Sequence, residues 1–500
     1  MIIRLTAVIR GMCLCAVIFM GMVLDGQAAP DMQKQNAHKR RAGTILYQVR
    51  AEATPAQQAA LQVALQSAGL RLEKQLRQGA FRARAPRAAV GSEEALALRI
   101  LQTGAVDWAE PDYEVQAVGI PNDPLFAQQW WHWAVHTPAA WDLTTGNSNI
   151  IIAVCDTGVQ TTHPDLAAHL ILPGYNTFLN NAYVEDSFGH GTMVAGFAGA
   201  IGNNGLGVAG MAWNIKILPI RITYADGVGS AYLSDMAEGL SYAADRGAKV
   251  INCSFSGYSS STIETAAKYA RGKGALICFA AGNSALDLSV GYLDSTNIVV
   301  VGATTATDTL ASWSNYGKPI DMVAPGENVM TTYLGGGYAS GSGTSFASPI
   351  TAGLAALIFS VNPGLAPVEV ERVLKSTCRD LGVAGDDNLY GAGMIQADAA
   401  VVLATKVIAA PTGLAATAAL KTVTLKWTDK ANNETGYYVE RALKTRTTYG
   451  AFTRVATLST NAQSFSQTVV AGSYAYRLQA FNGSTGVISD YSPTITITVR

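Results

Sequence analysis

The chain has 500 residues, a length that favours about three domains over a single core. Charged residues make up 14% of the sequence and the net charge is −1, with no basic run. This balance argues against a nucleic-acid partner and against binding to an anionic membrane surface.

The first 29 residues have the pattern of a signal peptide. Arg4 and Arg10 precede an apolar run over residues 12–24, and small residues follow at 26–29. The run is shorter than the about 20 apolar residues that a transmembrane helix needs. No later segment is expected to span a membrane. We therefore predict a secreted protein (extracellular or periplasmic) without a membrane anchor.

Four cysteines remain beyond this segment, namely Cys155, Cys253, Cys278 and Cys378. An exported protein can form disulfides, and the sequence does not choose between the possible pairings. Most of these cysteines lie in apolar, β-branched runs, where a buried free thiol is the more common outcome. We favour free thiols and leave the pairings open.

Residues 43–116 alternate short extended segments with amphipathic ones. The pattern predicts a strand at 44–49, a helix at 55–68, one or two strands within 70–85, a helix at 92–102 and a last strand at 106–113. The order β-α-β-β-α-β is typical of a small two-layer α+β domain.

Residues 119–405 alternate short β-branched runs with helix-like segments. The predicted strands fall at 150–154, 215–220, 250–252, 275–280 and 298–301. Such alternation predicts an α/β domain with a parallel sheet that is covered by helices on both faces. Functional groups of these sheets gather at the carboxyl ends of the strands, where the Asp156 and Asn283 segments are expected.

After a linker at 407–411, residues 410–500 contain turn signals and strands without helices. The predicted strands fall at 422–427, 437–441, 453–458, 474–481 and 494–499. This spacing predicts an all-β sandwich of the immunoglobulin-like kind.

Four short segments carry residues suited to hydrolysis by a serine nucleophile. Asp156 ends an apolar strand, His190 lies between glycines before a small-residue helix, Ser345 opens an apolar helix, and Asn283 follows a strand. Such a reaction needs a nucleophile, a base oriented by a carboxylate, and donors for the oxyanion. A turn-forming Asp, a structural His and a helix-capping Ser would each be the simpler interpretation of one segment alone.

The order of the segments decides against those simpler interpretations. Asp, His and Ser occur in the chain order of the subtilisins, which differs from that of chymotrypsin and of the α/β-hydrolases. Ala347 also replaces the last glycine of the G-x-S-x-G elbow that α/β-hydrolases use.

Residues 119–400 resemble the subtilisin-like serine proteases, and within them the thermitase-like branch. The resemblance rests on the four segments above and on the stretches at 122–124, 163–166, 203–210, 310–317 and 324–326. Residues 43–115 resemble the inhibitory propeptide of that family, which ends in Glu110-Pro111-Asp112-Tyr113. Residues 410–500 resemble a fibronectin type III domain through Trp427, Tyr474 and their strands.

The resemblance implies a serine endopeptidase that is made as a zymogen. Asp156, His190 and Ser345 would form the catalytic triad, and the Asn283 amide would bind the oxyanion. The propeptide would act as an intramolecular inhibitor until cleavage near residues 118–119. The partners would be protein or peptide substrates, and we expect a monomer.

The resemblance also implies a substrate pocket between two strand edges. One wall would be Ser254, Phe255 and Ser256, and the other Ala280, Ala281 and Gly282. Neither wall contains a carboxylate. We therefore expect a preference for apolar or aromatic side chains before the scissile bond.

A calcium site is implied in the same way. Asp123, Asp165 and Asn204 would supply side-chain oxygens, and Ile201, Leu206 and Val208 would supply carbonyl oxygens. The alternative is a loop of turn-forming residues without metal. A second site that the branch has between residues 174 and 187 is not expected, because Asn176 stands where an acid is required.

Two other functions remain to be weighed. In one, the protease fold is a non-catalytic scaffold and the C-terminal sandwich binds a partner; retention of all four catalytic segments argues against it. In the other, the enzyme processes one dedicated substrate, which the sequence does not distinguish from broad degradation.

Overall fold

The computed structural model describes residues 40–77, 79–85, 93–113 and 120–500. It divides into two compact units, Met1–Ala117 and Val118–Arg500. The predicted signal peptide and the predicted cleavage bond near residues 118–119 lie outside the described residues.

The first unit has the predicted order of strands and helices. Its elements are β1 (Arg40–Val49), α1 (Pro55–Ser67), β2 (Arg71–Gln75), β3 (Phe81–Arg84), α2 (Glu93–Leu101) and β4 (Val106–Tyr113). The strands pair antiparallel in the order β2-β3-β1-β4. Thr54 begins α1 through a capping box with Gln57, and Ile45 and Ile100 lie in the core of the unit.

The second unit is built on a seven-stranded sheet. Its strands are β5 (Ile151–Asp156), β6 (Tyr175–Asn176), β7 (Lys216–Arg221), β8 (Val250–Cys253), β9 (Leu276–Ala280), β10 (Val299–Thr304) and β11 (Met322–Pro325). Their order is β11-β10-β9-β8-β5-β7-β6, and every pairing is parallel. The predicted α/β domain with a parallel sheet is therefore confirmed.

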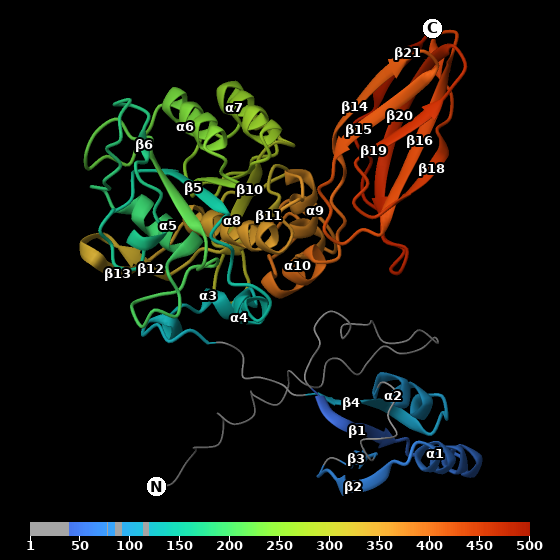
Figure 1. The fold of residues 1–500 in the computed structure, drawn as a ribbon. Coiled ribbons are helices and arrows are strands. Elements are labelled where there is room, and N and C mark those ends of the chain that lie inside the picture. The colour runs from blue at the N-terminus through green and yellow to red at the C-terminus, as the bar shows by residue number, and fades with distance from the viewer. Residues whose placement is uncertain (1–39, 78, 86–92, 114–119) are drawn as a thin grey trace, which may run out of the picture. The chain divides into compact units, whose positions relative to one another are not determined.

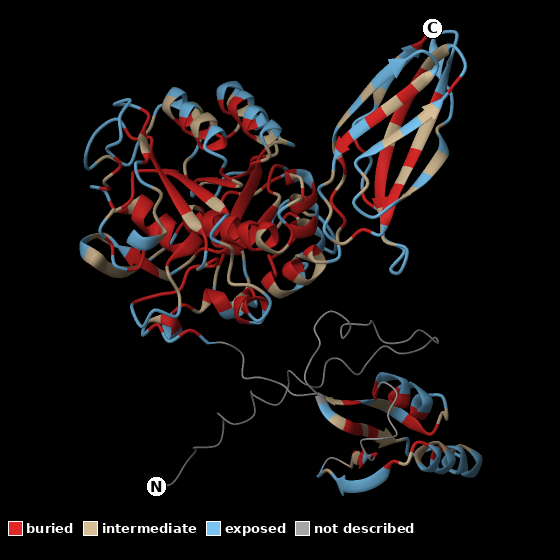
Figure 2. Cartoon of the chain, viewed as in Figure 1, coloured by how far each residue is buried: buried red, intermediate tan, exposed pale blue. Residues whose placement is uncertain are grey.

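Helices cover both faces of this sheet, with α6 and α7 on one face and α5 and α8 on the other (Figure 1). The helices of the domain are α3 (Trp131–Ala134), α4 (Thr137–Trp141), α5 (His190–Gly199), α6 (Leu233–Asp245), α7 (Ser261–Gly272), α8 (Thr344–Val361), α9 (Pro367–Thr377) and α10 (Ala397–Ala404). The central strands are buried along their whole length, as continuous β-branched runs require when both faces are covered (Figure 2).

Helix α8 corrects one expectation from the sequence. By length and composition it could cross a membrane, although no apolar segment of that length was expected after the signal peptide. The helix lies in the core of the domain and is 83% buried, so its apolar composition is that of a core helix.

The remaining elements of the domain are short. They are the turns η2 (Phe126–Gln128), η3 (Ala167–His169) and η4 (Leu334–Gly336), and the hairpin of β12 (Val329–Tyr333) and β13 (Gly337–Gly341). The β12–β13 hairpin was not predicted from the sequence.

The C-terminal region is all-β, as predicted. Its strands are β14 (Thr412–Ala419), β15 (Thr422–Thr428), β16 (Gly436–Thr445), β17 (Thr448–Tyr449), β18 (Thr453–Ser459), β19 (Ser464–Thr468), β20 (Gly472–Phe481) and β21 (Ile495–Val499). One sheet has the order β14-β15-β19 and the other β17-β16-β20-β21, with β18 also paired to β16. Trp427, Tyr437 and Tyr476 are buried in this region's own core.

The segment between the α/β domain and the sandwich is buried, whereas its composition predicted a free linker. Ile408 is 1% exposed and belongs to the core of the sandwich, while Ala409 is fully buried in the core of the α/β domain. The side-chain amides of Asn362 and Asn433 both donate to the Val407 carbonyl. Two cores and two amides therefore hold this segment in place.

The four cysteines of the described chain are free thiols. Cys155 and Cys253 face each other in register on β5 and β8, and both are fully buried. Burial is the largest cause that raises the pKa of each thiol, so neither is a reactive thiolate near neutral pH.

Candidate active site

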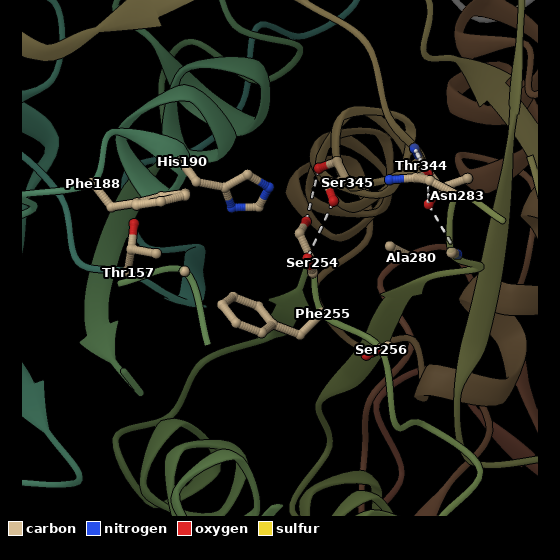
Figure 3. Close-up of a pocket in the computed structure, with 12 residues that line it drawn as sticks. Thr157, Phe188, His190, Ser254, Phe255, Ser256, Ala280, Asn283, Thr344 and Ser345 are labelled. Carbon is tan, nitrogen blue, oxygen red and sulfur yellow. Dashed lines mark hydrogen bonds between the residues drawn. The ribbon is translucent and has the colours of Figure 1, made fainter. Parts of the chain in front are cut away.

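A cavity of about 280 Å³ opens where the carboxyl ends of β8 and β9 meet the beginnings of α5 and α8. Figure 3 shows the side chains around it. The described residues that line the cavity are Thr157, Phe188, His190, Gly229, Ser254, Phe255, Ser256, Ala280, Gly282, Asn283, Thr344 and Ser345. The fold thus collects at one place the segments that the sequence analysis singled out.

Asp156 and His190 form a direct hydrogen-bonded pair. Asp156 is the last residue of β5 and is fully buried, and His190 is the first residue of α5. The Nδ1 of His190 lies 2.7 Å from Oδ1 of Asp156, and the same oxygen accepts the Thr157 N–H at 2.8 Å. A carboxylate acceptor at Nδ1 requires the proton on that nitrogen and leaves Nε2 free to accept one.

Gly191 allows the helix to begin so close to β5. A Cβ at this residue would lie 2.0 Å from the Gly158 carbonyl oxygen and 3.0 Å from Cβ of Asp156. A larger residue would therefore push His190 away from Asp156.

The pKa of His190 is raised above its ordinary value of 6.5. Burial alone would lower this pKa, but the charge of Asp156, the hydrogen bond to it and the charge of Asp186 together outweigh burial. The surroundings of the ring therefore favour the imidazolium form, which a general base must become during the reaction.

Ser345 is the second residue of α8 and is held by Ser254 on the facing wall. Its Oγ donates to the Ser254 carbonyl at 3.2 Å, while Oγ of Ser254 donates to the Ser345 carbonyl at 2.8 Å. Within the described residues no hydrogen bond joins Ser345 to His190. Such bonds are often long or unformed before substrate binds.

Pro349 explains why the Ser345 carbonyl is available to Ser254. Helix α8 begins at Thr344, and Pro349 lies inside the helix. Its missing N–H is the group that would otherwise bond to the carbonyl four residues earlier, which is that of Ser345.

Thr344 fixes the side chain of Asn283. The N–H and Oγ1 of Thr344 donate to Oδ1 of Asn283 at 2.9 and 2.8 Å. Because the oxygen is held there, the amide nitrogen points into the cavity toward Ser345 (Figure 3). Thr344 was not singled out from the sequence, although its place directly before the predicted nucleophile is a signal that could have drawn attention to it.

Five of the six residues that were predicted to form the substrate pocket line the cavity. Ser254, Phe255 and Ser256 line one side, and Ala280 and Gly282 line the other. Ala281 is 4% exposed and does not line the cavity; its carbonyl accepts the side-chain amide of Asn315 at 2.9 Å. No carboxylate lines the cavity in the described part of the chain.

Phe188 is a lining residue that the sequence analysis missed. Its ring is 48% exposed, and a Cβ on Gly229 would lie 2.7 Å from it, so the two residues pack directly together. Phe255 lies edge-on to His190 with the ring centroids 6.1 Å apart. Its place two residues before His190 was the sequence signal that could have found it.

Hydrogen bonds join Asp123 and Asp165, two of the residues predicted to bind calcium, to the loop of residues 201–208. Asp123 and Asp165 are 4% and 0% exposed. Asp123 accepts the Asn203 N–H at 2.6 Å, and Asp165 accepts the Asn204 amide at 2.7 Å and the Val208 N–H at 3.0 Å.

The charges of this loop suit a cation. The pKa of Asp123 is raised above its ordinary value, mainly by burial and also by the charge of Asp165. Hydrogen bonds from the N–H groups of Asn203 and Asn204 lower this pKa, but by less. No Lys or Arg forms a salt bridge with either carboxylate within the described residues. Buried oxygen donors with a like-charged pair fit a hard cation such as Ca²⁺.

The loop also shows what metal binding would change. The side-chain N–H of Asn204 donates to Oδ1 of Asp165, and the side-chain oxygen of Asn204 accepts the Leu206 N–H at 2.8 Å. A metal bound beside Asp165 would need this amide turned to present oxygen. The backbone of Ile201, whose N–H donates to the Asp165 carbonyl at 2.9 Å, lies in the same loop.

Known proteins resemble this chain most clearly over the α/β domain. Residues 147–393 match the model of the subtilase family. The thermophilic serine proteinase of Bacillus sp. strain AK1 is 42% identical over 60% of this chain and 75% of its own length. Thermitase of Thermoactinomyces vulgaris is 37% identical over 56% of this chain and 99% of its own length.

A solved structure agrees with these sequence relatives. A protease from Pseudoalteromonas arctica is 34% identical and aligns with a TM-score of 0.52, over 57% of this chain and 99% of its own length. The parallel sheet, the serine-lined cavity and these relatives lead to one conclusion: the chain belongs to the subtilase family, and it is a serine endopeptidase.

Proposed function

We propose that the protein is a secreted serine endopeptidase in which Asp156, His190 and Ser345 form the catalytic triad. The observation that carries this proposal is the 2.7 Å contact between His190 and the buried Asp156, at the rim of the cavity that Ser345 also lines. The chain order of the three residues and the family of the protein support the same assignment.

In the proposed mechanism His190 acts first as base and then as acid. Its Nε2 takes the proton from Ser345 as Oγ attacks the scissile carbonyl, and later gives the proton to the leaving amine. Water then enters, and the same cycle hydrolyses the acyl-enzyme. Asp156 holds the ring in the required tautomer and stabilises the imidazolium that forms twice in each turnover.

Asn283 and the Ser345 N–H would bind the oxyanion. The Asn283 amide is oriented before substrate arrives because Thr344 holds its oxygen with two hydrogen bonds. A donor that is already in place costs no reorganisation as negative charge develops on the substrate oxygen.

The cavity supports a preference for apolar or aromatic side chains before the scissile bond. Phe255 and Ala280 are among the residues that line the cavity, and no carboxylate of the described chain lines it to bind Arg or Lys. Ser256 adds a hydroxyl to this wall and would narrow the pocket. The preference argues against processing at dibasic sites.

A structural calcium ion is part of the proposal. Asp123, Asp165 and Asn204 would bind it with side-chain oxygens, and Ile201, Leu206 and Val208 with carbonyl oxygens. The ion would supply a positive charge between two buried carboxylates and so tie the segment at Asp123 to the loop. It would have no part in the chemical steps.

The rest of the chain would serve export and maturation. Residues 1–29 would direct secretion, and residues 43–116 would assist folding and inhibit the enzyme until they are removed. Residues 410–500 would form a fibronectin type III domain, for which the hydrogen bond from the Tyr474 hydroxyl to the Val470 carbonyl, 2.8 Å long, is a supporting feature. Full activity and normal yield from residues 119–500 expressed alone would refute the propeptide role.

The proposed activity is tested with succinyl-Ala-Ala-Pro-Phe-nitroanilide. The mature enzyme should release nitroaniline, and Ser345→Ala should lose almost all turnover while keeping its thermal stability. Ser342→Ala is the matched control, since this hydroxyl lies outside the cavity lining and accepts the Asn328 N–H. If folded wild type cleaves no peptide substrate, the scaffold function takes its place.

A further inference from the structure

Asp186 is a buried carboxylate beside the catalytic helix that the mechanism above does not use. It is 4% exposed. Its Oδ1 accepts the N–H groups of Phe188 and Gly189 at 3.0 and 2.8 Å and the Thr157 hydroxyl at 2.9 Å. Its Oδ2 accepts the N–H and the hydroxyl of Thr192 at 2.9 and 2.7 Å. Five donors converge on one carboxylate and fix it in position.

Thr157 connects this carboxylate to Asp156 and to Gly191, the residue after His190. Its backbone N–H donates to Oδ1 of Asp156, and its hydroxyl oxygen accepts the Gly191 N–H at 2.8 Å. A continuous chain of hydrogen bonds therefore runs from Asp186 through the Thr157 hydroxyl to the first turn of α5.

Helix α5 has no capping side chain at its own N-cap residue, Gly189. The free N–H groups of its first turn are satisfied instead by Thr157 and Asp186, which bond to Gly191 and Thr192. His190 is the first residue of that turn. The position of the His190 ring therefore depends on the hydrogen bonds that hold the first turn of α5 against the end of β5.

We propose that Asp186 is a positioning residue, which acts through Thr157 to hold the His190 ring between Asp156 and Ser345. The inference rests on the proposed function, because the place of the ring matters for turnover only if His190 is the base. Proton transfer from Ser345 to His190 requires the two side chains to lie within hydrogen-bond distance. A displacement of the ring by about 1 Å can therefore lower the rate on the order of 10²-fold.

A simpler role for Asp186 would be to cap the helix and stabilise the fold. The two roles differ in what they require of Thr157. A cap needs only the N–H groups that bond directly to the carboxylate, whereas positioning of His190 also needs the bridge through the Thr157 hydroxyl. Thr157 and Thr192 are both buried and both donate a hydroxyl hydrogen bond to Asp186. The Thr157 hydroxyl also accepts the N–H of Gly191, the neighbour of His190, whereas the Thr192 hydroxyl accepts the N–H of Gln160.

The experiment compares Thr157→Val with Thr192→Val in the mature enzyme. Both changes keep the side-chain shape and remove one hydroxyl from Asp186. We expect kcat on the peptide nitroanilide to fall on the order of 10–10²-fold in Thr157→Val with little change in KM. In Thr192→Val, the loss should be only a few-fold. Thermal unfolding of both variants measures the stability that each hydroxyl contributes.

Asp186→Asn adds a readout that a structural role would not move. The charge of Asp186 helps to raise the pKa of His190, so its removal should shift the acidic limb of the kcat/KM profile to lower pH. Thr157→Val changes no charge and should leave that limb in place. Asp156 is the other charged group that faces the ring; nearby, Arg221 pairs with Asp226 at 2.7 Å and Glu185 bonds to Thr161, and the variants alter none of these.

Equal losses of kcat in the two valine variants, or none in either, would overturn the proposal. So would an unchanged acidic limb in folded Asp186→Asn. If Asp186→Asn does not fold, the valine pair alone decides. Failure of the proposed function is a different result, since the wild-type enzyme would then lack turnover altogether.

Discussion

At the scale of single residues, the proposed catalytic groups are held in position before substrate binds. Asp156 holds one nitrogen of His190, Thr344 holds the oxygen of Asn283, and Ser254 holds the carbonyl of Ser345. In each case a neighbouring group determines which atom faces the cavity. Electrostatic stabilisation by such oriented groups is commonly the largest contribution to catalysis.

Removal of the Asn283 amide should therefore lower kcat while leaving KM nearly unchanged. Asn283→Ala is expected to cost on the order of 10²–10³-fold in kcat, the loss typical of removing one oxyanion donor from a subtilisin. Steady-state kinetics on the peptide nitroanilide measures the loss. Ser284→Ala, at the exposed neighbouring residue, is the control and should retain kcat. A retained kcat in Asn283→Ala would remove this amide from the mechanism.

The raised pKa of His190 predicts where activity is lost in acid. A base must be neutral to accept the Ser345 proton, and a folded-state pKa above 6.5 means that protonation begins at higher pH than for a free imidazole. The acidic limb of kcat/KM should therefore lie above pH 6.5. A limb well below that value would show that burial, and not the two carboxylates, controls this residue.

The sequence predicted the identities of these residues but not what orients them. The four predicted catalytic residues stand out because each lies at the end or the start of a strand or helix, and neighbouring residues in the sequence are enough to predict that strand or helix. They are Asp156, His190, Asn283 and Ser345. Thr157, Thr344 and Asp186 act through hydrogen bonds across elements that are far apart in the chain, as between Asp186 and Thr157. Contacts of that kind leave no periodicity in the sequence.

At the scale of elements, the parallel sheet gathers the site by ending its strands at one edge. Strands β5, β8 and β9 were predictable because their β-branched runs are buried on both faces. Strands β14 and β19 were missed because Ala, Ser and Thr dominate them and most of their residues are exposed or half-buried. The β12–β13 hairpin was missed for a similar reason, since one strand is rich in glycine.

The loop around Asp123 and Asp165 predicts a dependence on calcium at this scale. Chelation should speed thermal inactivation of the wild-type enzyme, because two buried carboxylates would then lack their cation. Asp123→Asn should inactivate faster than wild type and respond little to the chelator. Asp142→Asn, at an exposed acid, should respond as wild type does. Equal half-lives of the wild-type enzyme with and without chelator would remove calcium from the account.

At the scale of the whole molecule, two buried residues and one exposed ion pair join the sandwich to the α/β domain. Ile408 and Ala409 enter the two cores, and Arg372 pairs with Asp490 of the sandwich at 2.7 Å. Gly364 allows a still closer contact, because a Cβ there would lie 1.9 Å from the Lys430 carbonyl oxygen. The composition of residues 407–411 predicted a linker but carried no sign of this packing, which depends on two separately folded surfaces.

Gly364→Ala should therefore lower the unfolding free energy of the mature protein by about 1–3 kcal/mol, the usual cost of forcing extra atoms into a packed contact. Gly272→Ala is the matched control: it ends α7 with nothing within 4 Å of the new Cβ. That change should be neutral or stabilising by up to about 1 kcal/mol. Thermal and denaturant unfolding measure both. Equal stability of the two variants would mean that the sandwich does not pack against Gly364 in solution.

If Ser345 is a nucleophile that His190 activates, a fluorophosphonate probe should react with it covalently. We predict that the mature enzyme gains the mass of one phosphonyl group, located on Ser345 by peptide mapping, and loses turnover in proportion. His190→Ala should label far more slowly, and Ser345→Ala should not label. A folded enzyme that stays unlabelled, or that carries the group on another serine such as Ser254, would contradict the account.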